Sequence, residues 1–312
     1  MRPAAPHVTP PYQPRRRRAW RVLPVLPVLP FLAASALLAV MFLPAASAAG
    51  ATGPSYVALG DSYTSGPLIP NQTGTPAGCL RSTRNYPSLA AAALGAVSFT
   101  DASCSGATTA NMTAPQPVVG GSNPPELDAL SASTTLVTLQ IGGNDIGFAD
   151  IIINCTGLSL TSPLGSPCKN RYTAGGTDQL AQLITATGPK VAVVLAAIHR
   201  RAPQARVLLV GYPDILPATG NGCWPVVPIA HGDVPYLRGV ENELNAMLAG
   251  EAAANGATFV DTYSDSIGHD FCQRTGVKWV EGLVPTSPAA PVHPNALGEE
   301  ATAQQVLAAA SR

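Results

Sequence analysis

The sequence is poor in aromatic and in charged side chains. Aromatic residues make up 5% of the 312 residues and charged residues 12%, so the core of the fold must be built mainly from Ala, Val and Leu. Basic and acidic residues number 18 each, and no basic stripe follows the N-terminal arginines. This composition argues against a protein that binds nucleic acid or an anionic membrane surface.

The first 48 residues have the pattern of a secretory signal peptide. Arginines at 15–18 precede an apolar stretch over residues 22–44, and Ala46-Ser47-Ala48 then forms a small-residue cleavage site. We expect export of a domain of residues 49–312 with a net charge of −6 and no membrane anchor. A retained anchor is the alternative, and three prolines within the apolar stretch argue against it. The arginines leave the export route open.

All six cysteines follow this segment. An even number in an exported chain predicts three disulfides. A zinc site would need a C-x-x-C pair or a nearby histidine, which the sequence lacks, so we expect no metal. Several pairings are formally open. The order of the cysteines and the layout of the strands favour Cys79–Cys104, Cys155–Cys168 and Cys223–Cys272.

Short apolar runs alternate with stretches of helical spacing in residues 49–312. Strands are predicted at residues 55–59, 97–99, 135–141, 207–210 and 258–260. Helices are predicted around 86–94, before Pro203, over 237–248 and from Pro294, which we place at the first helical position. We interpret residues 147–176 as a long irregular insert held by a disulfide. The alternation predicts one α/β domain, a three-layer α/β/α sandwich with about five parallel strands.

Polar motifs follow three of the predicted strands. Gly60-Asp61-Ser62 comes after the first strand, Gly106 follows the second, and Gly142-Gly143-Asn144-Asp145 follows the third. Ligands of such sheets bind outside the carboxyl ends of the strands, so these residues should face one crevice. Ser62 there would expose its hydroxyl at a helix start, and Asn144 would present an amide to a developing oxyanion. Each motif alone is also compatible with an ordinary turn.

His293 precedes the last predicted helix within the triplet His293-Pro294-Asn295. The positive end of a helix dipole disfavours an imidazolium, and a neutral imidazole is what a general base requires near pH 7. Three other histidines compete with it. His199 lies beside two arginines at a helix end, where a structural role is expected, and His231 and His269 lie in loop-rich inserts.

Taken together and in order, the motifs resemble those of the SGNH (GDSL) hydrolases, a family named for the residues that here are Ser62, Gly106, Asn144 and His293. The resemblance covers nearly all of residues 49–312, and the cysteine pattern is similar to that of secreted bacterial esterases, lipases and phospholipases. It implies a flavodoxin-like fold and a serine ester hydrolase without metal or organic cofactor. In such an enzyme Ser62 is the nucleophile and His293 the base, and the N–H groups of Ser62 and Gly106 hold the oxyanion together with the Asn144 amide.

One position departs from the family pattern. Many members have an aspartate three residues before the histidine, where this sequence has Ala290. The ring N–H of the histidine must therefore find another acceptor. We favour a main-chain carbonyl at Ala290 or Pro291, and a carboxylate such as Glu281 or Asp265 is the alternative.

The substrate is less defined than the chemistry. The resemblance favours lipid or fatty acyl esters, and acetylated polysaccharide is the alternative because the same machinery serves both. An acyltransferase would use the same acyl-enzyme, whereas a secreted, non-catalytic binding protein would leave the joint motifs unexplained. Trp224 and Trp279 are candidates for the pocket wall, although a tryptophan near a disulfide more often packs in a core. We expect a secreted monomer.

Overall fold

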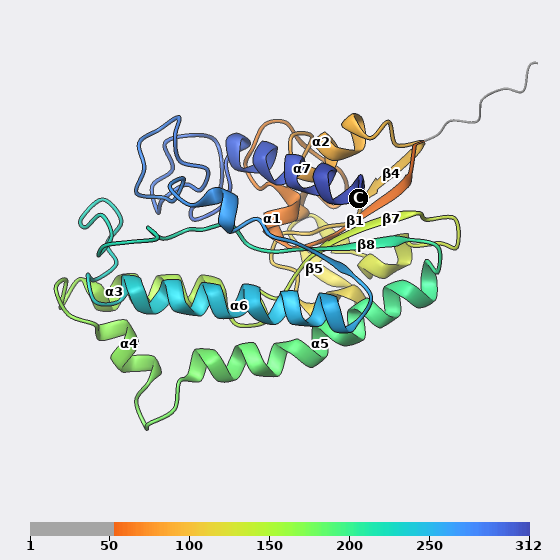
Figure 1. Cartoon of the computed structure of the whole chain (residues 1–312). Coiled ribbons are helices and arrows are strands. Elements are labelled where there is room, and N and C mark those ends of the chain that lie inside the picture. Colours follow the sequence, from red (N-terminus) through yellow and green to blue (C-terminus); the bar gives the residue numbers. More distant parts are fainter. Residues whose placement is uncertain (1–52) are drawn as a thin grey trace, which may run out of the picture. The chain divides into compact units, whose positions relative to one another are not determined.

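Five parallel strands form the central sheet of the computed structural model, which describes residues 53–312 (Figure 1). The strand order is β4-β1-β7-β8-β9, and every neighbouring pair is parallel. The bounds are β1 Ser55–Gly60, β4 Ser98–Asp101, β7 Leu136–Gln140, β8 Arg206–Val210 and β9 Thr258–Val260. This sheet confirms the five strands predicted from the sequence. The predicted signal peptide lies outside the described residues.

Helices cover both faces of the sheet and complete the three predicted layers (Figure 1). One face carries α2 (Tyr86–Ala93) and α7 (Ala296–Ala310), which pack against each other. The opposite face carries α5 (Gln179–Arg201) and α6 (Val234–Ala254), which also form a pair. Adjacent residues of β1 point to opposite layers, since Tyr56 joins the core beneath α2 and α7 while Val57 joins the core beneath α5 and α6. Because both faces are covered, the three central strands β1, β7 and β8 are buried along nearly their whole length without alternation.

Short elements fill the connections between these strands and helices. Among residues 53–312, the small antiparallel pairs are β2 Gln72–Thr73 with β3 Arg81–Ser82, and β5 Gln116–Val118 with β6 Gly121–Asn123. The 3₁₀ helices are η1 Ala77–Cys79, η2 Thr109–Met112, η3 Glu126–Ala129 and η4 Ser264–Ser266. Disulfides join Cys79 to Cys104, Cys155 to Cys168 and Cys223 to Cys272, the pairs that the sequence favoured.

The segment 147–176 is not the irregular insert that we expected. It contains two helices, α3 (Phe148–Ser159) and α4 (Pro167–Tyr172), which the disulfide between Cys155 and Cys168 joins. Three consecutive isoleucines in α3 hide the helical period, because Ile151 and Ile152 are buried whereas Ile153 is exposed. Tertiary packing of the buried pair therefore stabilises a helix that local pattern does not reveal.

The start of α7 also differs from the expectation. Pro294 is not the first helical residue, since α7 begins at Ala296 and Asn295 is its N-cap. The Asn295 side chain accepts hydrogen bonds from the N–H groups of Leu297 and Gly298, at 2.9 and 3.3 Å. Asparagine is among the strongest N-capping residues, so the helix begins directly after Asn295, three residues beyond His293.

Candidate active site

Ser62 lies at the carboxyl end of β1, where the chain turns sharply into the short helix α1 (Ser62–Ser65). Asp61 caps this helix, because its Oδ1 accepts a hydrogen bond of 2.9 Å from the Tyr63 N–H. Gly60 has a φ of +145°, and a Cβ there would lie 2.3 Å from the Thr64 hydroxyl oxygen. Only glycine fits this turn, which brings Ser62 to the edge of the sheet where the motifs were expected to meet.

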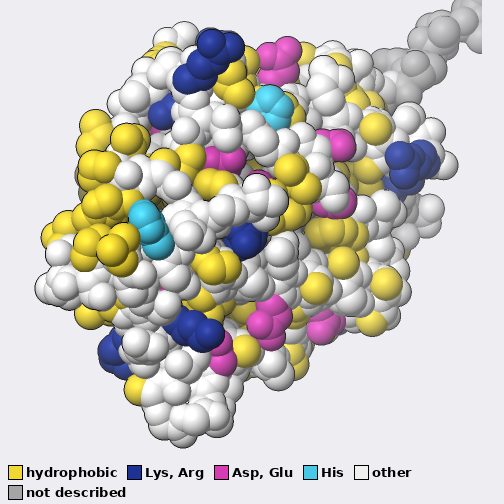
Figure 2. All heavy atoms as spheres, turned by 60° about the vertical axis from the view of Figure 1, so that its left-hand side comes forward, with side chains coloured by type: hydrophobic (Ala, Val, Ile, Leu, Met, Phe, Trp, Pro, Cys, Tyr) yellow, Lys and Arg dark blue, Asp and Glu magenta, His cyan; other side chains and the backbone are white. Residues whose placement is uncertain are grey.

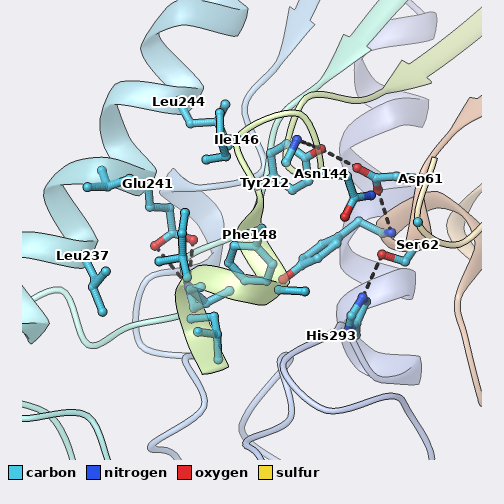
Figure 3. Close-up of a pocket in the computed structure, with 18 of the residues that line it drawn as sticks. Asp61, Ser62, Asn144, Ile146, Phe148, Tyr212, Leu237, Glu241, Leu244 and His293 are labelled. Atoms are coloured by element: carbon cyan, nitrogen blue, oxygen red, sulfur yellow. Dashed lines mark hydrogen bonds between the residues drawn. The ribbon is translucent and has the colours of Figure 1, made fainter. Parts of the chain in front are cut away.

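His293 reaches Ser62 from the loop before α7 (Figure 3). Its Nε2 lies 2.7 Å from the Ser62 Oγ, and its Nδ1 lies 2.7 Å from the main-chain oxygen of Pro291. A carbonyl oxygen only accepts hydrogen bonds, so Nδ1 must carry the ring proton. Nε2 is then left unprotonated and accepts the hydrogen bond of the Ser62 hydroxyl.

The acceptor for the ring is thus a main-chain carbonyl, which was the favoured alternative. Glu281 is occupied elsewhere, because it accepts from Asn295 Nδ2 at 2.8 Å and from the Thr286 N–H at 2.7 Å and pairs with Lys278 Nζ at 2.9 Å. The backbone N–H of Glu281 donates to the carbonyl of His293. Glu281 therefore supports the histidine loop from behind and does not bond the ring.

The second carboxylate considered, Asp265, accepts a hydrogen bond from Gln305 at 3.2 Å and does not bond the His293 ring.

Burial lowers the pKa of His293 below its usual 6.5, although the hydrogen bond to Pro291 acts in the opposite direction. The imidazole is therefore neutral at pH 7, as a general base must be.

The competing histidines have structural partners. His269 stacks on Trp279 with ring centroids 4.0 Å apart, and its Nδ1 lies 2.6 Å from the carbonyl of Val277. His199 Nε2 lies 3.0 Å from the carbonyl of Asn255. Neither of these histidines nor His231 lines the cavity beside Ser62.

Gly106 and Asn144 line the same cavity as Ser62. One N–H of the Asn144 amide donates to the carbonyl of Ala107 at 2.9 Å, which leaves the second N–H for another acceptor. Within residues 53–312, the backbone N–H groups of Ser62 and Gly106 donate to no protein acceptor. Three residues that line the cavity thus each have an N–H group without a protein acceptor in the described part of the chain, a set of donors suited to a developing oxyanion.

The cavity beside Ser62 has a volume of about 200 Å³ and a largely apolar wall. Most of its apolar residues come from α3, from α6 and from the segment after β8 (Figure 3): Phe148, Ile151, Ile152, Ile215, Leu216, Leu237, Val240 and Leu244. Two acidic residues, Asp61 and Glu241, also line the cavity, and burial raises the pKa of Glu241 well above the usual range. Trp224 and Trp279 are not part of this wall.

Several of these residues escaped the sequence reasoning. The wall on α3 was missed because that helix was taken for irregular structure. Tyr212 also lines the cavity, and it stands two residues beyond the last residue of β8. The expectation that useful residues follow strands would have identified Tyr212 had it been applied to the fourth predicted strand.

The surface beside this wall is partly apolar. Figure 2 shows hydrophobic side chains gathered on one side of the face that it presents, with charged groups scattered over the rest. On α3 and the loop that follows it, Ile153, Leu160 and Leu164 are each more than half exposed. The helix that forms one wall of the cavity therefore also exposes apolar side chains to solvent.

Comparison with known proteins agrees with this geometry. The profile of the GDSL-like lipase/acylhydrolase family matches residues 58–301. The chain belongs to this family. As a GDSL-family protein it is a carboxylic ester hydrolase, and its sheet is that of the SGNH fold.

Its similarity to individual family members extends over most of the chain. Lipase 2 of Streptomyces coelicolor is 43% identical over 256 residues, which cover 81% of this chain and 84% of that lipase. Phospholipase A1 from Streptomyces albidoflavus has a crystal structure that superposes with a TM-score of 0.67 at 29% identity. The crystal structure of an extracellular lipase from Streptomyces rimosus gives 0.65, also at 29% identity. Each structure match covers 82% of this chain and 99% of the other.

Proposed function

We propose that this GDSL-family hydrolase is a secreted lipase or esterase that cleaves fatty acyl esters through Ser62 and His293. The observation that carries the proposal is the hydrogen bond of 2.7 Å between Ser62 Oγ and His293 Nε2. It supports a dyad, because the third partner is the main-chain oxygen of Pro291 rather than a carboxylate. The carbonyl holds the ring in the tautomer that accepts a proton.

The reaction then proceeds in two halves. The Ser62 Oγ attacks the ester carbonyl carbon while its proton passes to His293 Nε2. The resulting oxyanion receives hydrogen bonds from the Ser62 and Gly106 N–H groups and from the free N–H of Asn144. His293 returns the proton to the leaving alcohol as the C–O bond breaks. Water, deprotonated by His293, then attacks the acyl-enzyme and releases the carboxylic acid and free Ser62.

A fatty acyl substrate is supported by the wall of the cavity. Its side chains from α3 and α6 are mostly apolar, and burying an acyl chain there gains about 0.8 kcal/mol for each methylene group. The exposed Ile153, Leu160 and Leu164 lie on or just after the same helix α3. Lipase and phospholipase activities in the names of the similar proteins agree with this choice.

Secretion forms part of the proposal. Residues 1–48 have the pattern of a signal peptide, and residues 49–312 would form the exported hydrolase domain. Three disulfides among the described residues suit an oxidising compartment outside the cytoplasm. The similar lipase from Streptomyces rimosus is described as extracellular.

Hydrolysis of p-nitrophenyl esters from acetate to palmitate tests the chemistry and the chain-length preference together. Ser62→Ala should lower kcat by at least about a thousandfold and abolish labelling by a fluorophosphonate. Ser65→Ala is the matched control, because Ser65 is buried in the same short helix and its hydroxyl has no hydrogen-bond partner within residues 53–312. Full activity of Ser62→Ala would refute the proposal.

The role of Pro291 is tested by restoring the family pattern. In Ala290→Asp, a carboxylate would stand where many relatives have one. Because the Pro291 carbonyl already holds Nδ1 at 2.7 Å, we expect kcat to change by no more than about threefold. A gain of a hundredfold would show that the carbonyl orients the ring poorly.

A further inference from the structure

Tyr212 is fixed where the backbone leaves β8. Its N–H donates to Asn245 Oδ1 at 2.8 Å, and its carbonyl accepts from Asn245 Nδ2 at 2.9 Å. The side chain of Asn245 in α6 therefore bonds both the N–H and the carbonyl of Tyr212. The ring packs edge-on against Tyr63, with centroids 5.1 Å apart and an interplanar angle of 80°. Backbone and ring are thus both constrained, so the hydroxyl has a defined position.

The hydroxyl of Tyr212 joins two turns that carry proposed catalytic groups (Figure 3). It donates to Asp61 Oδ2 at 2.6 Å, and Asp61 immediately precedes Ser62. It also accepts from the Gly143 N–H at 2.9 Å, and Gly143 immediately precedes Asn144. A Cβ on Gly143 would approach the Tyr212 hydroxyl oxygen to 3.1 Å, so the close contact favours glycine at this position.

These hydrogen bonds make Asp61 an acceptor on both carboxyl oxygens, which an ionised carboxylate serves best. Tyr212 has a single hydroxyl hydrogen, which points to Asp61 because the opposite side of its oxygen receives the N–H of Gly143. Asp61 Oδ1 already accepts from the Tyr63 N–H. A proton on Asp61 takes one acceptor position and removes the negative charge, which weakens the buried hydrogen bond from Tyr212 or from the Tyr63 N–H.

We propose that Tyr212 is a positioning residue whose hydroxyl couples the Asp61 carboxylate to the backbone of Gly143 and so holds Asn144 in place for oxyanion stabilisation. The inference rests on the proposed function, since it assumes that Ser62 and Asn144 act on the ester. Protonation of Asp61 weakens the coupling. In a plot of kcat against pH, the fall of kcat toward acidic pH therefore reports the protonation of Asp61 as well as that of His293.

The surroundings of Asp61 place this ionisation close to neutrality. Burial raises the pKa of Asp61 to about 7, the hydrogen bonds from Tyr212 and Tyr63 act to lower it, and the charge of Asp145 raises it. Glu126, which accepts from the Gly60 N–H at 2.7 Å, faces Asp61 from η3. Burial lowers the pKa of His293 below its usual 6.5, so its ionisation falls on the acid side of that of Asp61.

The test is a comparison of kcat, KM and pH profile among three variants and the wild-type enzyme. Tyr212→Phe removes the hydroxyl and should lower kcat by about tenfold to a hundredfold, with KM changed less than about twofold. Because the coupling runs through this hydroxyl, the limb that reports the ionisation of Asp61 should also disappear from the pH profile of kcat. Tyr56→Phe is the matched control, because this buried tyrosine bonds Thr138 at 2.8 Å in the core beneath α2 and α7.

Asp61→Asn provides an independent arm. Its amide has one acceptor oxygen for two donors, so it mimics the protonated carboxyl group. We expect lower kcat and a profile in which the limb near pH 7 is gone and only the lower limb of His293 remains. This arm decides the question alone if Tyr212→Phe does not fold, as judged by circular dichroism.

The outcomes separate the inference from the proposed function. Wild-type kcat and an unchanged pH profile in Tyr212→Phe would overturn the inference, as would a limb near pH 7 that persists in Asp61→Asn. Either result could occur while Ser62→Ala is inactive, and then the proposed function stands. If Ser62→Ala keeps its activity, the proposed function itself fails.

Discussion

Replacing Lys278 by methionine should destabilise the loop that carries His293. The Lys278 Nζ lies 2.9 Å from a Glu281 carboxylate oxygen, and the two side chains are 7% and 0% exposed. Glu281 in turn accepts from Asn295, the N-cap of α7, and its backbone N–H donates to His293. The substitution therefore leaves a buried carboxylate without its counter-charge directly behind the site.

The magnitude follows from burial and charge. Burial acts to raise the pKa of Glu281, but hydrogen bonds from Asn295, Thr286 and Lys278 and the charge of Lys278 lower it to about 2. Removing one partner of a buried ion pair costs about 3–5 kcal/mol. For a domain of this size the midpoint of thermal unfolding should then fall by roughly 10 °C at pH 7.

The pH dependence has a defined sign. The pKa of Glu281 is lowered by folding from 4.5 to about 2, so its stabilisation is present above 4.5 and is lost as the pH falls toward 2. In Lys278→Met the pKa of Glu281 rises, and the loss of stability over this acidic range becomes smaller.

Urea unfolding at pH 7, monitored by fluorescence with the disulfides intact, measures the loss in the free energy of unfolding. Lys190→Met is the matched control, because Lys190 is half exposed and lies 3.7 Å from Asp145, where a salt bridge contributes less than about 1 kcal/mol. Equal losses in the two variants would refute the reasoning, since burial would then have no bearing on the strength of the pair.

Three further predictions concern a disulfide, the wall of the cavity and the turn before Ser62. Cys223→Ser with Cys272→Ser opens a loop of 49 residues and should cost about 4 kcal/mol in urea unfolding under oxidising conditions, and a loss below about 1 kcal/mol would contradict the entropic argument. Leu244→Phe narrows the cavity and should lower kcat/KM for palmitate relative to acetate esters by about tenfold, whereas an unchanged ratio would place the acyl chain elsewhere. Gly60→Ala should not yield folded protein by circular dichroism, because its Cβ would meet Gln140 O at 2.5 Å; a native spectrum would show that the turn relaxes.

The strands, the motifs that follow them and the presence of disulfides were predictable, because they depend on local sequence chemistry. Short apolar runs marked the five strands, and a glycine directly follows the runs 55–59, 135–141 and 207–210. Strands that are covered on both faces read as such continuous apolar runs. Polar motifs directly after strands then placed Ser62, Gly106 and Asn144 at one edge of the sheet. An even set of six cysteines indicated disulfides without any knowledge of the fold.

The remaining features arise from contacts between distant segments. The acceptor for His293 is the main-chain oxygen of Pro291, and every residue carries such an oxygen, so no side-chain pattern distinguishes it. The cavity wall on α3 was hidden because consecutive isoleucines do not show which of them are buried. Tyr212 bonds partners 151 and 69 residues away in the chain, and only folding makes them neighbours. The sequence by itself determined which groups reach the edge of the sheet, whereas the tertiary structure decided which of them bond to one another.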